Sequence, residues 1–261
     1  VQYKQATHIH HVAMWDGAAW QAMQHGVGGT ALEVGAFAPV TGGLFVGGVF
    51  DSASGLDVSN IAFWNGSSWD RAGYGVNNRV RSLVAGNGVL YVGGDFTSAS
   101  YFLPGPPYVQ VVTANQVAQY NSLSPGSLTT WSALGSGLNG NVEDLVFDSS
   151  TLYAGGWFSQ SGATTTRRLA SWNGSSWQEW LGGVSGTNAI AQSIALDSDG
   201  ITVAGQFTQA GALAVSVSNI TRWANSYRYH DATNTWEAWT PPATLFAYQL
   251  NSPLTVSGLF S

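Results

Sequence analysis

The sequence predicts an all-β chain, built as a five-bladed β-propeller of four-stranded antiparallel blades. Three observations support this prediction: a glycine motif occurs five times, two aromatic residues mark each unit, and no window of a dozen residues has helical periodicity. Short β-rich units that repeat about every fifty residues are typical of propellers. We therefore expect residues 1–261 to form a single domain.

The repeated motif is a seven-residue strand with glycine at its fifth position. These glycines are Gly48, Gly94, Gly156, Gly205 and Gly258. They lie 46, 62, 49 and 53 residues apart, which gives approximate repeats of 1–50, 51–96, 97–158, 159–207 and 208–261. Because glycine has no Cβ, it allows the close backbone approach that is needed near the axis of a propeller.

An apolar or alternating segment precedes each glycine strand, as in residues 80–84, 142–147 and 191–196. Its length of five or six residues and its pattern predict another strand. Each unit therefore contains this strand, the glycine strand and the two aromatic strands that follow.

The two aromatic strands are joined by a turn, and an aromatic residue stands on each side of it. The pairs are Trp15 and Trp20, Trp64 and Trp69, Tyr120 and Trp131, Trp172 and Trp177, and Trp223 and Trp236. Asp-Gly or Asn-Gly in the first, second and fourth pairs predicts a tight type I′ hairpin, in which both central residues have positive φ. The remaining two connections are the longer loops 121–130 and 224–235. We expect the paired aromatics to lie between neighbouring blades.

The two ends of the chain hold complementary halves of one unit. The chain begins with an aromatic strand and a tryptophan strand, and it ends with the segment 245–250 and a glycine strand. We expect these N-terminal and C-terminal strands to pair, which would complete a fifth blade and close the ring without long exposed edges.

The order of double glycine, aromatic residue and tryptophan resembles the kelch repeat. Residues 229–236 are similar to the tyrosine-to-tryptophan half of a kelch blade. The motifs Leu-Tyr-Val-Gly-Gly-x-Phe and Ile-Ala-x-Trp-Asn-Gly-Ser-Ser-Trp are similar to repeats of secreted bacterial propellers and fungal cell-surface cortical-marker proteins. Such propellers serve as scaffolds, as binding platforms and, less often, as enzymes, so the resemblance implies the fold more than the function. Five blades depart from the six or seven that are common in kelch propellers.

The composition excludes several classes of function. Charged residues are 8% of the chain, against about 25% in typical domains, and the net charge is −6. This balance provides no basic surface for nucleic acid, and no apolar run is long enough for membrane insertion. The absence of cysteine excludes disulfides, thiol catalysis and a copper-radical site of the galactose oxidase type.

No catalytic, metal or cofactor site is predicted. The acids that an enzyme would need occupy unlike repeat positions: Glu33, Glu143, Asp144, Glu179 and Glu237. His8 and His10 have a spacing that suits a metal, but a polar edge strand is the favoured interpretation. The Asp197-Ser-Asp-Gly200 segment is similarly interpreted as a hairpin turn rather than part of a calcium loop.

Three asparagines, Asn65, Asn173 and Asn219, fit the N-glycosylation pattern. For the first two, Asn-Gly is also the expected hairpin turn, so both interpretations remain open. The candidate ligand-binding residues lie in two loops that break the repeat: Tyr101, Phe102, Tyr108, Tyr227, Tyr229 and His230. Aromatics on stiff loops can stack on sugars or anchor a protein, and equally they can pack on their own blade.

These observations favour a non-catalytic extracellular or cell-surface propeller. It would act as a structural or adhesive module within a larger protein or assembly, with protein partners or neighbouring subunits and with glycans as further ligands. Two alternatives remain: a glycan-binding lectin and a carbohydrate-active enzyme.

Overall fold

The computed structural model describes residues 11–126, 129–197, 200–224, 226–230 and 235–239. Every secondary-structure element in these ranges is a β-strand, which confirms the all-β prediction. None of the described residues belongs to a helix that could cross a bilayer.

Three successive sheets have four antiparallel strands each, hydrogen-bonded in chain order. Sheet A contains β4 (Glu33–Val40), β5 (Gly43–Val49), β8 (Ile61–Trp64) and β9 (Trp69–Arg71). Sheet B contains β11 (Val80–Gly86), β12 (Val89–Gly94), β15 (Val117–Tyr120) and β16 (Trp131–Ala133). Sheet C contains β17 (Val142–Asp148), β18 (Thr151–Gly156), β21 (Leu169–Trp172) and β22 (Trp177–Glu179). The predicted strand order within each unit is thus confirmed.

Sheet D has three strands, β24 (Ile190–Asp197), β25 (Gly200–Gln206) and β28 (Ile220–Ala224). Its expected fourth strand, β30 (Thr235–Trp239), pairs instead with β29 (Ser226–His230), which lies inside the predicted 224–235 loop. The loop prediction is therefore wrong for 226–230. Pairing these two neighbouring segments closes a much shorter loop than the pairing of β30 with β28 would.

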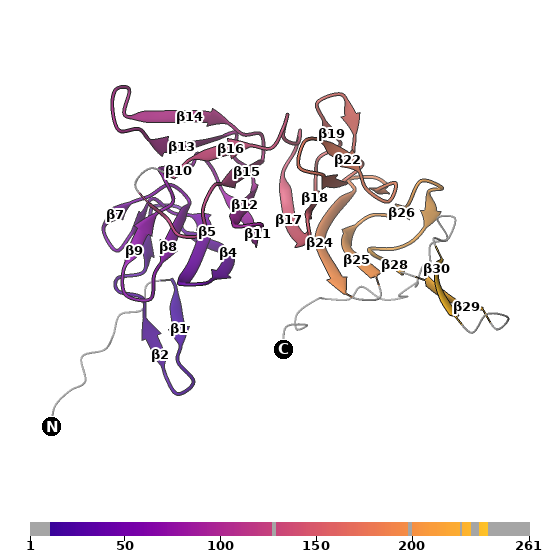
Figure 1. Cartoon of the computed structure of the whole chain (residues 1–261), viewed down its shortest axis with the longest axis horizontal. Coiled ribbons are helices and arrows are strands. Elements are labelled where there is room, and N and C mark those ends of the chain that lie inside the picture. Colours follow the sequence, from indigo (N-terminus) through magenta and orange to yellow (C-terminus); the bar gives the residue numbers. More distant parts are fainter. Residues whose placement is uncertain (1–10, 127–128, 198–199, 225, 231–234, 240–261) are drawn as a thin grey trace.

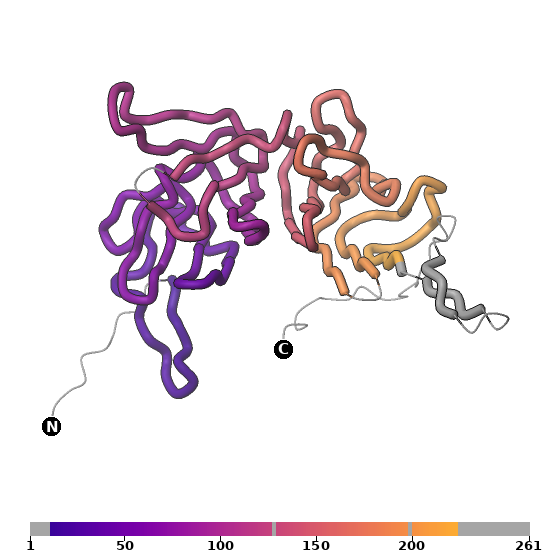
Figure 2. The backbone as a smooth tube through the Cα atoms, viewed as in Figure 1, coloured from indigo at the N-terminus to yellow at the C-terminus, as the bar shows by residue number. Residues whose placement is uncertain are grey.

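The first strands of the four sheets pack side by side, in the order β4, β11, β17 and β24. Figure 1 shows the sheets following one another along an arc, in the order of the colour scale. The N-terminal hairpin of β1 (Ala13–Trp15) and β2 (Trp20–Ala22) extends away from sheet A, at the indigo end of the tube in Figure 2. The C-terminal strands that would pair with it, in 245–260, lie outside the described residues, so ring closure stays a prediction.

In each sheet, a small hairpin connects the second strand to the third strand. In sheet B, β13 (Ser98–Phe102) and β14 (Val109–Thr113) form this hairpin, and β13 also pairs with β10 (Gly75–Val76), which leads into the same sheet. The corresponding hairpins elsewhere are shorter: β6 (Ser52–Ala53) with β7 (Leu56–Asp57), β19 (Gln160–Ser161) with β20 (Thr164–Thr165), and β26 (Gln209–Ala210) with β27 (Val215–Ser216). Strands β3 (Val27–Gly28) and β23 (Val184–Ser185) pair as β10 does. The insertion in sheet B therefore lengthens an element that every sheet has.

The first three motifs have two consecutive glycines, and these serve different contacts. The second glycine lies against the first strand of its own sheet, where a Cβ on Gly94 would overlap the carbonyl oxygen of Arg79. That strand has a β-bulge at this point, between Val80 and Ser82. The first glycine faces the next sheet, so a Cβ on Gly93 would meet the side chain of Val142. Sheets A and C repeat both arrangements.

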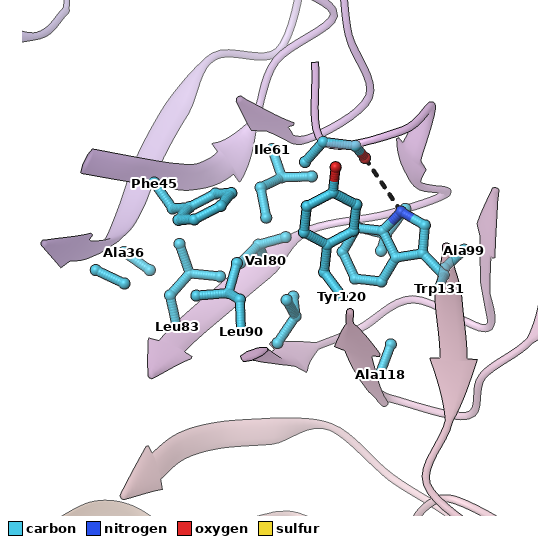
Figure 3. Packing of buried hydrophobic residues seen from close by; sticks show 14 of the residues in the cluster. Ala36, Phe45, Ile61, Val80, Leu83, Leu90, Ala99, Ala118, Tyr120 and Trp131 are labelled. Carbon is cyan, nitrogen blue, oxygen red and sulfur yellow. Dashed lines mark hydrogen bonds between the residues drawn. The ribbon is translucent and has the colours of Figure 1, made fainter. Parts of the chain in front are cut away.

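Apolar side chains form a layer between each pair of consecutive sheets. One layer joins Phe45 and Phe63 of sheet A to Leu90, Tyr120 and Trp131 of sheet B, and Figure 3 shows most of these side chains packed together. Equivalent layers lie between the N-terminal hairpin and sheet A, between sheets B and C, and between sheets C and D. The expected position between units is confirmed for three aromatic pairs, Trp64 with Trp69, Tyr120 with Trp131 and Trp172 with Trp177, whereas Trp15 and Trp20 are exposed.

A tryptophan on the fourth strand of each four-stranded sheet also bonds to the preceding unit. The indole N–H groups of Trp69, Trp131 and Trp177 donate to the carbonyl oxygens of Met23, Ala72 and Leu134 at 2.9, 3.1 and 2.9 Å. Each acceptor lies three residues after the tryptophan of its own unit, at Trp20, Trp69 and Trp131. The same bond is therefore repeated between successive units, and we call these three bonds the tryptophan relay.

The hairpins that join the aromatic strands are confirmed, but their predicted turn type is wrong. Trp64 pairs with Trp69 across a four-residue loop in which Gly66 has positive φ and Asn65 does not. The Asn65 side-chain oxygen accepts the N–H groups of Ser67 and Ser68, which leaves a type I′ turn unnecessary. The loops at Asp16 and Asn173 use the same side-chain bonds.

We expect Gly94→Ala to destabilise the chain by about 1–3 kcal/mol, because the new methyl group would collide with the Arg79 backbone. Gly105→Ala is the matched control, since a Cβ at Gly105 meets no atom within 4 Å. Urea unfolding followed by tryptophan fluorescence measures both variants. Equal stabilities for the two variants would contradict the assigned role of the second glycine.

Candidate ligand-binding pocket

A pocket of about 520 Å³ lies where sheet A adjoins the loops of sheet B. Sheet A lines it with the three residues of β9, and the hairpin β6–β7 adds Leu56. The hairpin and the long connection of sheet B contribute Phe102, Leu103, Pro125 and Gly126, and Gly73 lies between the sheets. Its volume falls within the roughly 300–1,000 Å³ of small-molecule sites. Strand β9 is the outermost strand of its sheet, so the pocket runs beside an unpaired sheet edge.

Both of the loops that break the repeat within sheet B reach this pocket. Phe102 and Leu103 belong to the insertion, and Pro125 and Gly126 belong to the long 121–130 connection. In the sequence these two departures are separate segments, residues 101–108 and 121–130. The fold brings them to one place.

One charged residue of each sign lies in the pocket. The Arg71 side chain is held by a 2.7 Å bond from its Nε to the carbonyl oxygen of Asp57, and its guanidinium carbon lies 6.0 Å from the centre of the Phe102 ring. Asp70 Oδ2 accepts a 3.0 Å hydrogen bond from Asn65 Nδ2. These bonds orient both side chains. They leave the terminal nitrogens of Arg71 and Oδ1 of Asp70 for a ligand.

The Tyr120 hydroxyl is buried directly behind the pocket. Burial raises the pKa of Tyr120, and the neighbouring Thr129 hydroxyl and the backbone of Gly73 and Gly126 partly offset this rise. None of these groups meets Tyr120 Oη in hydrogen-bonding geometry, so the hydroxyl is unpaired among the described residues. Buried hydroxyls are usually satisfied, so Tyr120 leaves one unpaired polar atom close to Gly73 and Gly126 of the pocket wall.

The six ligand-binding residues expected from the sequence do not all meet. Phe102 lines the pocket and stacks on Tyr74 with 4.0 Å between ring centres. Tyr101 is half-buried against the hydrophobic layer between sheets A and B, and Tyr108 is 61% exposed in its loop. The side chains of Tyr227, Tyr229 and His230 lie outside the described residues. Sequence reasoning missed Asp70 and Arg71. The sequence distinguishes them in one way: the equivalent residues after the tryptophan in sheet C are Gln178 and Glu179.

The three sequon asparagines are all exposed. In two of them the sequon serine donates to the asparagine side chain at 2.9 Å, from Ser67 to Asn65 and from Ser175 to Asn173. Asn219 has a backbone role instead: it adopts φ 65°, and its carbonyl oxygen accepts the N–H of Gly205. The attachment of glycans to these sites stays a prediction.

Several acids that occupy unlike repeat positions meet arginines near the first strands. Arg81 binds Asp95 through two bonds of 2.6 and 3.0 Å and reaches Glu143 at 3.1 Å. Glu33 pairs with Arg79 at 2.9 Å. This network cross-links β11 to the sheets on both sides of it, and its acids are occupied by arginines. Among the described residues there is no group of three metal-ligating side chains.

Asp144 is the most deeply buried acid with a shifted pKa. Burial raises its pKa above the ordinary value of 3.8, although hydrogen bonds from the backbone of Ile194 and from the Ser82 hydroxyl act in the opposite direction. The Ile194 N–H donates to Asp144 at 2.7 Å, and the Leu145 N–H donates to Ser82 Oγ at 3.0 Å. These bonds link the first strands of sheets B, C and D, which is a structural role.

No family model matches the chain, and no curated protein matches it in sequence. Solved structures with some likeness include two computationally designed proteins. Ika4 is 10% identical with a TM-score of 0.40, and the match covers 76% of this chain and 94% of Ika4. Ika8 is 12% identical with a TM-score of 0.38, and the match covers 73% of this chain and 58% of Ika8. The extracellular domain of the one-component system BT4673 from B. thetaiotaomicron is 14% identical with a TM-score of 0.31, covering 78% and 33%. These likenesses are too distant to support a fold or a function.

The raised pKa of Asp144 predicts a pH-dependent stability. The folded state binds a proton more tightly than the unfolded state, so the contribution is fully present below the ordinary pKa and is lost as pH rises through the folded pKa. Asp144→Asn removes this dependence and keeps a side-chain acceptor. We expect the stability of the variant relative to the wild type to increase from about pH 4 to pH 7, as measured by urea unfolding. A relative stability that falls over this range would show that the folded pKa is depressed.

Proposed function

We propose that this chain is a non-catalytic binding module, a kelch-like propeller of five blades that acts at the cell surface or outside the cell. The observation that supports binding is the pocket beside β9. Its lining includes residues of both segments of sheet B that depart from the repeat, the long hairpin with Phe102 and the connection with Pro125. Loops that a regular scaffold positions are where binding residues concentrate.

The absence of paired acids in the pocket favours binding over catalysis. Among the described residues that line it, Asp70 is the only one with a carboxylate. A glycosidase generally needs two carboxyl groups flanking the bond that it cleaves. Asp95 and Glu143, which lie close together outside the pocket, are both bound to Arg81.

Closure at five blades is supported by the N-terminal hairpin. Trp15 and Trp20 are 53% and 61% exposed, whereas the corresponding pairs in sheets A, B and C are at most 8% exposed. Those pairs are covered by the preceding unit. In a closed ring, sheet D and the C-terminal strands would cover Trp15 and Trp20 in the same way.

A residue with positive φ directly before the first aromatic strand of each unit also supports closure of the ring. Asn60, Gln116, Arg168 and Asn219 have positive φ, and their carbonyl oxygens accept the N–H of Gly48, Gly94, Gly156 and Gly205. His11 occupies the equivalent position and has φ 63°. The glycine that matches His11 in the repeat is Gly258, on the strand that would close the ring.

The surface chemistry supports an extracellular location and an adhesive role. Only 8% of the residues are charged, so hydration depends on hydroxyl and amide side chains, and glycans at Asn65, Asn173 or Asn219 would add to it. The proposed partners are proteins or neighbouring subunits of an assembly, with glycans as further ligands.

Binding to the outer surface of the cells that produce the chain tests this function. We expect labelled chain to be retained by intact cells, and Phe102→Ala to weaken retention about tenfold because it removes a wall of the pocket. Gln178→Ala, a change on β22 of sheet C, is the control and should bind as the wild type does.

A chain found only in the cytosol would contradict the proposed location. Retention that Phe102→Ala leaves unchanged would contradict the proposed site. Release of product from a panel of glycosides by the purified chain would support the enzyme alternative instead.

Replacement of Trp20 tests closure. If the ring is closed, Trp20→Phe removes a buried donor and should destabilise the chain by about 1–3 kcal/mol, as Trp177→Phe should do in sheet C. Differential scanning calorimetry of both variants measures the effect. A loss below about 0.5 kcal/mol for Trp20→Phe alone would indicate an open arc.

A further inference from the structure

We propose that the pocket beside β9 binds a neutral saccharide. This inference rests on the proposed function, because it names the ligand of the same site. It is carried by three properties of the pocket: a donor and an acceptor that are adjacent in the chain, an aromatic wall, and no net charge.

Asp70 and Arg71 together select for hydroxyl groups. The terminal nitrogens of Arg71 have no partner among the described residues, so they can donate to a ligand. Asp70 uses Oδ2 for Asn65 and offers its other oxygen as an acceptor. One sugar hydroxyl can accept from the arginine, and another can donate to the aspartate. Because the two side chains carry opposite charges, a singly charged ligand is attracted by one of them and repelled by the other, so the pocket as a whole selects no charged ligand.

The remaining walls suit the apolar face of a sugar ring. Leu56, Phe102, Leu103 and Pro125 contribute apolar surface. Tyr74 stacks on Phe102 with an interplanar angle of 33° and so holds the ring in position. A preformed wall of this kind lowers the entropy lost on binding.

An extended peptide fits the pocket less well. It would have to add to β9, which is three residues long, so few backbone hydrogen bonds are available. The hydrogen-bonding groups that the pocket does offer are side chains with opposite charges, which favours a ligand rich in hydroxyl groups.

Sheet C provides a matched comparison within the chain. Gln178 pairs with Ser171 as Asp70 pairs with Phe63, so it holds the place of Asp70. The hairpin of sheet D that corresponds to β13–β14 is β26–β27, which has two-residue strands and carries no equivalent of Phe102. A change at Gln178 therefore alters the same strand position without touching a pocket of this kind.

The test is an array of neutral and acidic glycans probed with the full chain, followed by calorimetric titration of the glycans that bind. We expect neutral glycans to bind, with the Kd raised about tenfold or more by Phe102→Ala and by Asp70→Asn. Asp70→Asn preserves the side-chain shape, so it remains informative if Phe102→Ala is poorly folded. Gln178→Ala should leave the Kd within about twofold of the wild type.

Three results would overturn the inference, and they are distinguishable. Binding restricted to sialylated or sulfated glycans would exclude a neutral ligand. Silence on the array, with binding of a random peptide library that depends on Phe102, would reject the saccharide and leave the proposed binding function standing. Silence with both glycans and peptides would reject the pocket as a binding site, and the proposed function with it.

Discussion

The close approach of backbones at two consecutive glycines is the constraint on which the rest of the structure depends. In sheet B, the second strand lies against a bulge of the first strand at Gly94. At Gly93 the missing Cβ leaves room for the Val142 side chain of sheet C. This spacing brings consecutive sheets near enough for apolar layers to form between them. It also places each fourth-strand tryptophan within reach of a carbonyl group in the preceding unit. A side chain at either glycine would separate these surfaces.

The candidate site lies where sheet B adds longer segments to this regular packing. Sheet B keeps the glycines and the tryptophan bond, but it lengthens one hairpin and one turn. Both additions extend over the outer strand of sheet A, whose Asp70 and Arg71 differ from the corresponding residues of sheet C. The chain has only 22 charged residues, 8 basic and 14 acidic. Most of the arginines described above serve contacts between strands, so the partly unpaired Arg71 is distinctive.

Much of the fold could be predicted from the sequence, because the glycine motif and the aromatic pairs mark the second, third and fourth strands of each unit. The turn type could not, because the Asn65 side chain accepts two backbone N–H groups and so stabilises a four-residue loop in place of a two-residue type I′ turn. Strand β29 was missed because the repeat has no counterpart for it. In the site, Phe102 was predicted from its loop, whereas Asp70 and Arg71 were not, since their role depends on a neighbouring sheet.

The tryptophan relay provides the most direct test of the account. Hydrogen exchange of the indole N–H groups, followed by NMR on the full chain, reports whether each is buried in a hydrogen bond. The account predicts slow exchange for Trp69, Trp131 and Trp177, whose bonds are described, and equally slow exchange for Trp20 in a closed ring. Rapid exchange of Trp20 beside three protected indoles would contradict closure, and rapid exchange of all four would contradict the packing between the sheets.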